Sequence, residues 1–238
     1  MRRLIPEFAK APIRRYLHSK AALRSQAGQD FWVVGEVFNE LRGGYFLDIG
    51  AHDGIQLSNT YILEKKYGWT GICIEANPAI FERLIRHRRA RCINACLDSG
   101  DGIVQFAKSE FFGGIVSAET DNHPVSARGD VVALRTVALA TILQEQGAPS
   151  EIDYLSIDVE GAEERVLGSF PFEKYRFKCM TVERPTPALR DLFRRSGYVL
   201  VKEIPGLDCF YVRADFLDQY RANTFSFYRK KWLIFGFG

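Results

Sequence analysis

Short apolar runs alternate with amphipathic segments along most of this chain. The runs have the length and the residues of buried strands, whereas the segments between them repeat apolar residues at helical spacing. The predicted strands cover residues 45–49, 70–75, 91–97, 103–107, 153–159, 177–183, 198–203 and 209–212. The predicted helices cover residues 30–41, 57–67, 79–88, 140–146, 162–167 and 186–196. Strands that alternate with helices predict an α/β fold with a mainly parallel sheet.

Two stretches depart from this alternation. Residues 198–203 and 209–212 are strand-like runs joined by a short connection, which predicts an antiparallel hairpin at one edge of the sheet. Residues 108–130 are rich in glycine, serine and polar residues and show no clear period. Loops of this length in a compact domain are often lids or substrate loops, so we expect this segment to line a substrate pocket.

Net charge and cysteine content narrow the class of protein. The formal net charge of +3 is too small to demand a nucleic-acid partner. The arginine run at residues 83–91 has little aromatic interleaving, so we expect a solvated helix face there and no nucleic-acid binding. The five cysteines are odd in number, and Cys73, Cys179 and Cys209 lie in apolar runs. This pattern indicates buried reduced thiols and a cytoplasmic location.

The length fits one domain with an extension at each end. Residues 1–24 are predicted to form a basic arm, residues 25–213 the domain, and residues 214–238 an aromatic and basic extension. The simplest interpretation is that the arm is solvated and that the extension packs on its own domain or on a second subunit of a homo-oligomer. The alternative is peripheral membrane contact through both ends. A membrane-spanning segment is not expected, because no apolar run is long enough to span a bilayer.

The segment YFLDIGAHDG at residues 45–54 carries the strongest chemical signal. An apolar strand reaches Asp48, and a glycine turn with a second acid, Asp53, follows. In α/β folds, the turn at the carboxyl end of a strand binds ligands. A turn that holds phosphate needs backbone N–H groups and positive potential, so these two acids disfavour a dinucleotide. They suit a cationic ligand with an ammonium and a sulfonium, such as S-adenosylmethionine.

Further acids end the neighbouring predicted strands. Glu75 has the spacing at which such folds place a carboxylate on ribose hydroxyls, and we expect that role. Asp98 ends the next strand, with Ser99 beside it. Asp98 and Ser99 either accept a hydrogen bond from the adenine amine or cap their own backbone in a turn.

A third group of acids follows the strand at residues 153–159. Asp158 lies at the carboxyl edge of the predicted sheet, and Glu183 ends the neighbouring strand. Two carboxylates on adjacent strand ends can share a divalent cation such as magnesium, or one of them can act as a general base toward a hydroxyl.

Other titratable residues lie close to these strand ends. Glu163 and Glu164 are assigned to the first turn of a helix, where the helix dipole favours acids, whereas this explanation does not suit Glu160. His52 in the first turn and His123 in the irregular loop are candidates for a base or a substrate contact.

Together these residues resemble the FkbM-type methyltransferases, a branch of the S-adenosylmethionine-dependent class I fold. The resemblance covers roughly residues 25–213 and rests on the order and spacing of several motifs. The motifs are SQAGQD at residues 25–30, FLDIGAHDG at 46–54, SNTY at 58–61, GICIEANP at 71–78 and IDVEGAE at 157–163.

The resemblance implies a Rossmann-like, seven-stranded sheet with helices on both faces, and O-methylation of a sugar or polyketide hydroxyl. The segment at residues 25–30 resembles part of a cap over the cofactor; the alternative is a helix N-terminus in which Asp30 caps the helix from Phe31 onward. The expected cofactor-binding residues are Gln26, Asp48, Gly50, Asp53, Asn59, Glu75, Ala76, Asp98, Ser99 and Asp158. Many relatives have a histidine where this chain has Ala162, so the base in this chain has to be another group.

We therefore expect a methyltransferase that uses S-adenosylmethionine to methylate a hydroxyl of a sugar, glycolipid or polyketide-like small molecule. The expected base is Asp158, Glu183 or His52, and positioning supplies most of the catalysis because the donor is already activated. An alternative is a catalytically idle module of the same fold that acts in interaction or membrane-surface assembly. The sequence leaves the acceptor, the metal and the oligomeric state open.

Overall fold

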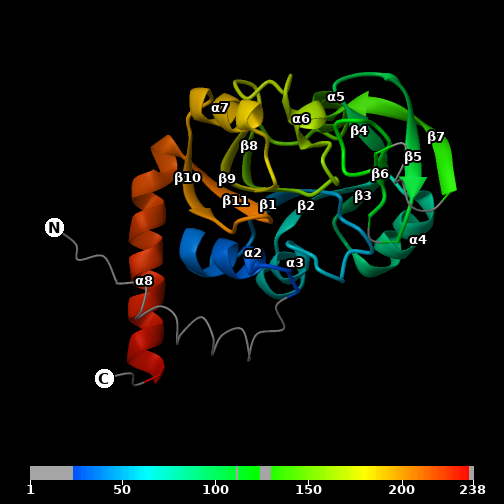
Figure 1. Ribbon diagram of the computed structural model, residues 1–238. Helices are drawn as coiled ribbons and strands as arrows, with labels where there is room; N and C mark the ends of the chain where they lie inside the picture. The colour runs from blue at the N-terminus through cyan, green and yellow to red at the C-terminus, as the bar shows by residue number, and fades with distance from the viewer. Residues whose placement is uncertain (1–23, 111, 124–129, 236–238) are drawn as a thin grey trace.

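The computed structural model describes residues 24–110, 112–123 and 130–235 (Figure 1). These residues form an α/β body with a larger and a smaller sheet, and a long C-terminal helix that extends from one side of it. The predicted basic arm, apart from Arg24, lies outside the described residues.

The larger sheet has seven strands in the order β10-β11-β9-β8-β1-β2-β3. The strands are β1 (Tyr45–Ile49), β2 (Thr70–Glu75), β3 (Arg91–Asn94), β8 (Glu151–Ile157), β9 (Arg176–Glu183), β10 (Tyr198–Glu203) and β11 (Asp208–Arg213). Neighbouring strands are parallel except for β11, which runs antiparallel to both β9 and β10. This arrangement confirms the predicted fold class, including the antiparallel hairpin at one edge.

Helices cover both faces of the larger sheet (Figure 1). The elements are α2 (Gln29–Phe31), the π-helix η1 (Trp32–Val37), α3 (Tyr61–Tyr67), α4 (Pro78–His87), α5 (Leu139–Glu145), α6 (Glu163–Leu167) and α7 (Pro187–Arg195). Successive strand residues point to opposite faces. Leu47 therefore packs with α5, α6 and α7, whereas Phe46 packs with η1, α3 and α4. Asp48 follows the alternation and lies on the same face as Phe46.

The smaller sheet corrects the prediction for residues 91–138. The predicted strand 91–97 is divided at Ala95: β3 stays in the larger sheet, and β4 (Cys96–Asp98) enters the smaller one. The other strands there are β5 (Gly102–Lys108), β6 (Gly114–Ile115) and β7 (Asp130–Ala138), in the order β4-β7-β5-β6. The sequence pattern did not predict β6 or β7: the segment predicted as an irregular loop contains β6, begins at the last residue of β5 and ends at the first residue of β7.

Two helix boundaries also differ from the prediction. The helix predicted from residue 57 begins at Tyr61, because the Ser58 hydroxyl accepts hydrogen bonds from the N–H groups of Thr60 and Tyr61 and holds a turn there. The helix predicted to reach residue 41 ends at Val37 as a π-helix. Asn77 caps α4 as its position indicates, with its side chain accepting from the N–H of Ala79 at 3.1 Å.

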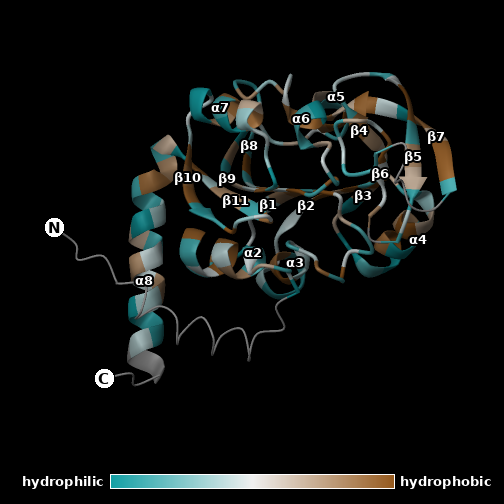
Figure 2. Cartoon of the chain, in the orientation of Figure 1, coloured by the Kyte–Doolittle hydropathy of each residue, from teal (hydrophilic) through white to brown (hydrophobic). Residues whose placement is uncertain are grey.

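The C-terminal extension forms α8 (Leu217–Phe235), which packs on η1. Phe227 and Tyr228 are buried, and the Tyr228 hydroxyl donates to Glu36 Oε1 at 2.7 Å. Hydrophilic residues recur along α8 (Figure 2). Among the described helices, none is long and apolar enough to cross a bilayer. Peripheral membrane contact and homo-oligomer formation stay predictions.

Candidate active site

A cavity of about 690 Å³ opens where the strands of the larger sheet end. Its walls include Asp48, Glu75, Asp158 and Glu183, which lie at or just beyond the carboxyl ends of β1, β2, β8 and β9. The sheet topology thus brings together acids that are far apart in sequence, as expected for open α/β folds. Residues from the smaller sheet and its connections complete the walls.

The turn after β1 brings the chain very close to the end of β8. Gly50 has φ +78°, and a Cβ atom built on it would lie 1.8 Å from the carbonyl oxygen of Asp158. The N–H groups of Gly50 and Ala51 both donate to Ile74 O at 3.0 Å. Only glycine fits this position, so the turn and the segment that carries Asp158 are held in one arrangement.

Asp48 is buried below this turn and already has partners within the protein. Its Oδ2 accepts from the Thr60 hydroxyl at 2.5 Å and lies 3.8 Å from Arg88 Nη1. Burial raises the pKa of Asp48, while Arg88 and Thr60 act in the opposite direction. The Arg88 guanidinium is fully buried and also donates to Glu64 Oε2 at 3.0 Å. The prediction that Arg88 belongs to a solvated face was therefore wrong, because this side chain is buried and contacts both Asp48 and Glu64.

Glu75 lies in the cavity wall with both carboxylate oxygens fixed by backbone groups. Oε1 accepts from the N–H of Asn77 at 2.8 Å, and Oε2 accepts from the N–H of His52 at 3.0 Å. Burial raises the pKa of Glu75, and these backbone hydrogen bonds oppose the rise. Each carboxylate oxygen keeps a second lone pair, so the carboxylate can still accept from two vicinal hydroxyls.

Three of the residues expected at the cofactor lie outside the cavity wall. Asp98 pairs with Arg165 at 2.5 Å. It also accepts a hydrogen bond from the N–H of Ser99 at 2.8 Å, as in the alternative in which Asp98 caps its own backbone. Ser99 is exposed. Asp53 accepts from the N–H groups of Ile55 and Gln56 and so shapes the turn.

Apolar residues line the cavity in the region where Asp98 and Ser99 were expected. They are Ala76, Ile80, Leu97 and Phe106. Ala76 was a predicted contact, but Phe106 was not, because the smaller sheet that carries it was not predicted. A flat apolar ring such as adenine is the kind of group that this wall can cover.

The remaining predicted residues Gln26, Asn59 and His52 all line the cavity. Asn59 Nδ2 donates to the Ser156 hydroxyl at 2.9 Å, whereas its Oδ1 is buried without a hydrogen-bond partner in the part of the chain described. His52 has φ +50°, and its Nε2 lies 2.8 Å from the carbonyl oxygen of Glu110. His123 is exposed and does not line the cavity.

Asp158 and Glu183 form a carboxyl pair at the end of the cavity beside Gly50. Burial raises the pKa of Asp158 well above its usual range, and the charge of Glu183 and a hydrogen bond shared with it add to the rise. Glu183 Oε2 is buried and receives no N–H or hydroxyl donor from the described residues. A proton held by Asp158 would supply such a donor, and the hydrogen bond to Glu183 is one of the causes of the raised pKa of Asp158.

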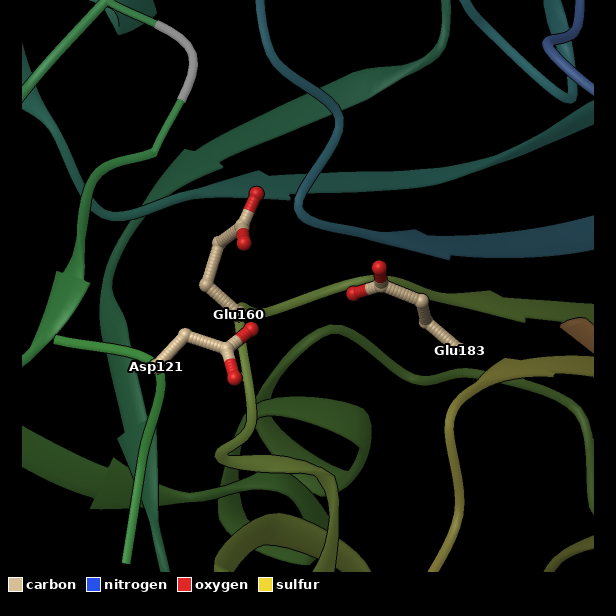
Figure 3. Close-up of side chains that lie close together, drawn as sticks. All are labelled: Asp121, Glu160 and Glu183. Carbon is tan, nitrogen blue, oxygen red and sulfur yellow. The ribbon is translucent and has the colours of Figure 1, made fainter. Parts of the chain in front are cut away.

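A second group of acids adjoins this pair. The carboxylate oxygens of Asp121, Glu160 and Glu183 lie within 4.8 Å of one another and come from separate segments (Figure 3). Arg184 has φ +34° and contacts all three carboxylates, including Glu183 Oε1 at 2.8 Å and Glu160 Oε2 at 3.6 Å. Burial raises the pKa of Glu160 to about 7, with Glu183 adding to the rise and Arg184 opposing it. Arg184 thus supplies the positive charge here, and the divalent cation stays a prediction.

The sheet order, the edge hairpin and the cavity at the strand ends define a class I methyltransferase fold. The chain belongs to the FkbM methyltransferase family, because the family model described as methyltransferase FkbM domain matches residues 48–200. Methyltransferases of this class use S-adenosylmethionine as their cofactor.

Two solved structures are similar to this chain. One is a TehB-like SAM-dependent methyltransferase from Corynebacterium glutamicum, with 13% identity, a TM-score of 0.38, and 88% of this chain and 100% of that chain covered. Another is a methyltransferase from Pyrococcus furiosus, with 15% identity, a TM-score of 0.36, and 85% and 82% covered. No curated protein matched the chain.

Proposed function

We propose that this chain methylates a hydroxyl oxygen of a sugar, glycolipid or polyketide-like small molecule, with S-adenosylmethionine as donor. The observation that carries the proposal is the Asp158–Glu183 pair, two hydrogen-bonded carboxyls in the wall of the cavity that also holds Glu75. A hydroxyl nucleophile has to lose its proton as it is methylated, and a carboxylate at that place can accept it.

The residues present suit the cofactor. Glu75 would accept from the ribose hydroxyls, and the wall of Ala76, Ile80, Leu97 and Phe106 would cover the adenine. The buried Asn59 Oδ1 has no partner among the described residues and would accept a hydrogen bond from the methionine portion. When bound, S-adenosylmethionine supplies a methyl group that its sulfonium has already activated.

In this proposal the chain orients the acceptor and removes one proton. Asp158, in its unprotonated form, accepts the proton of the acceptor hydroxyl, and Glu183 keeps the basicity of Asp158 high through its negative charge. His52 is the second candidate for the base, because its ring lines the same cavity. Aligning the hydroxyl with the methyl group is expected to supply most of the rate, as in other reactions of two positioned groups.

Methyl transfer by the double variant Asp158→Asn with Glu183→Gln tests the assignment. With isotope-labelled S-adenosylmethionine and a panel of hydroxylated glycans, glycolipids and small molecules, we expect turnover to fall about 100-fold or more. Calorimetry should show cofactor affinity close to that of the wild type. Asp101→Asn, in an exposed turn, is the matched control. Full turnover by the double variant would exclude both acids as the base and leave His52.

A further inference from the structure

Asn122 is a buried polar residue, and the nitrogen of its side-chain amide has no hydrogen-bond acceptor among the described residues. The residue is 4% exposed and lines the cavity. Its Nδ2 is buried and makes no hydrogen bond within the described chain. A buried N–H donor without an acceptor is costly and rare in folded proteins, so this group is expected to find its acceptor on a ligand.

The segment that carries Asn122 is fixed in place on the acidic end of the cavity. The N–H of Asp121 donates to Glu160 O at 3.0 Å, and the Asp121 carboxylate pairs with Arg184. The carbonyl of Asn122 accepts from the N–H of Ser117 at 3.1 Å. Asn122 Nδ2 and Glu160 Cβ both lie against Gly114, at 2.7 and 3.3 Å from the place of its missing Cβ. Gly114 therefore lies against both the orphaned donor and the side chain of Glu160.

The charge of the cavity wall limits what can bind beside this donor. Among the described residues that line it, seven are Asp or Glu and one is Arg. The single guanidinium, that of Arg184, already contacts three carboxylates. A phosphate or carboxylate bound at the Asp121, Glu160 and Glu183 carboxylates would meet like charges without a free cation, which opposes its binding there. An ammonium group, in turn, has no lone pair to offer to the Asn122 amide.

We propose that the acceptor site takes an uncharged polyhydroxyl ring, and that Asn122 donates a hydrogen bond to a hydroxyl oxygen next to the one that is methylated. The proposal rests on the proposed function for the identity of the reacting hydroxyl, and it names the class of acceptor and a specificity residue. Phosphorylated and carboxylated sugars are expected to bind more weakly than uncharged ones because of the acidic wall.

Direct binding tests this proposal without relying on turnover. Enzyme saturated with S-adenosylhomocysteine is titrated with a panel of methyl glycosides, their 6-phosphates, the corresponding uronates and the 2-amino derivatives. We expect at least one uncharged glycoside to bind, and its 6-phosphate and uronate to bind at least about 10-fold more weakly. Equal or tighter binding of the charged members, binding of the amino member alone, or binding of no member would overturn the proposal.

The role of Asn122 is tested in the same titrations. Asn122→Ala should raise the Kd of the uncharged glycoside about 3- to 10-fold, the effect of one neutral hydrogen bond, without changing cofactor affinity. Gln105→Ala, an exposed amide on β5, is the matched control and should change neither Kd. An unchanged glycoside Kd in a folded Asn122→Ala protein would contradict the assignment.

The charge argument has its own variant. Asp121→Asn combined with Glu160→Gln should reduce the discrimination against the 6-phosphate, because it removes two of the like charges and leaves Arg184 paired with Glu183 alone. Unchanged discrimination in this folded variant would contradict the argument. Binding of the uncharged glycoside without methyl transfer would leave the acceptor-site proposal standing and would refute the proposed O-methylation.

Discussion

Gly50 and Asp158 are in van der Waals contact through backbone alone: a Cβ at residue 50 would lie 1.8 Å from the Asp158 carbonyl oxygen. The contact joins the turn after β1 to the segment that follows β8. A side chain at residue 50 would therefore displace the segment that carries the candidate base.

Gly50→Ala is expected to destabilise the protein and abolish cofactor binding. The new methyl group has to displace the backbone of Asp158, and φ +78° disfavours any L side chain. Gly43→Ala is the matched control, because Gly43 has φ +75° but nothing within 4 Å of its missing Cβ. We expect Gly43→Ala to cost about 1–2 kcal/mol in the free energy of unfolding and Gly50→Ala to cost clearly more. Equal costs in denaturant unfolding would refute the importance of the contact.

Glu75→Gln is expected to weaken S-adenosylmethionine binding about 10- to 100-fold, because a neutral amide replaces a charged acceptor. The amide also offers only one oxygen, so the N–H of either His52 or Asn77 loses its acceptor. Calorimetry and thermal unfolding would measure both effects. Glu82→Gln, an exposed acid on α4, provides the control. A cofactor Kd equal to that of the wild type would remove Glu75 from the cofactor site.

The rate of methyl transfer should fall at acidic pH, and the acidic limb of the profile of kcat against pH should report the protonation of Asp158. The pKa of this carboxyl is raised by burial and by Glu183, and a base is active only when it is unprotonated, so activity is lost as pH falls through the raised pKa. Glu183→Gln removes the negative neighbour and should move the limb to lower pH. A limb that stays in place in this variant, in a profile of kcat against pH, would point to His52 instead.

Glu163→Gln should stabilise the protein at alkaline pH. Burial, with the charge of Glu183 adding to it, raises the pKa of Glu163 from 4.5 to about 7, although backbone N–H groups oppose the rise. The folded state therefore binds this proton more tightly than the unfolded state. Its stabilising contribution is complete below the unfolded pKa and is lost as pH rises through about 7.

At about pH 8 the Glu163→Gln variant should have a free energy of unfolding about 2–3 kcal/mol larger than that of the wild type. At about pH 4 the difference should be close to zero. The glutamine oxygen can still accept from the N–H of Val159, which donates to Glu163 Oε1 at 2.9 Å. Glu164→Gln, the exposed neighbour, controls for the loss of a charge from the first turn of α6. A gain of the same size at both pH values would contradict the assignment.

The parts of the fold that the sequence predicts well are those with a strong local pattern. The run that ends in Asp48 and the run that ends in Glu75 could be placed on neighbouring strands, because buried parallel strands are apolar and end in polar turns. The departure of the chain at Ala95 has no such signal. Asn94 is polar, but Ile93, Cys96 and Leu97 are apolar, and it is the pairing with β7 that takes β4 out of the larger sheet.

The residues of the candidate site that the sequence predicts are acids at strand ends. The residues that it does not predict reach the site from a helix end or from irregular segments. Arg88 has the local pattern of an exposed helix end, and its burial depends on Asp48 and Glu64, which lie on other elements. Asn122 and Arg184 are single residues in irregular segments, and no spacing in the sequence marks them. Their roles depend on long-range contacts that only the three-dimensional structure contains.

The docking of α8 on η1 has a practical consequence for handling the protein. Phe227 of α8 packs against Phe31 of α2, with ring centroids 5.7 Å apart. Gln26, just before α2, lines the cavity. A fusion or surface attachment that displaces Phe227 would therefore disturb the segment that follows Gln26.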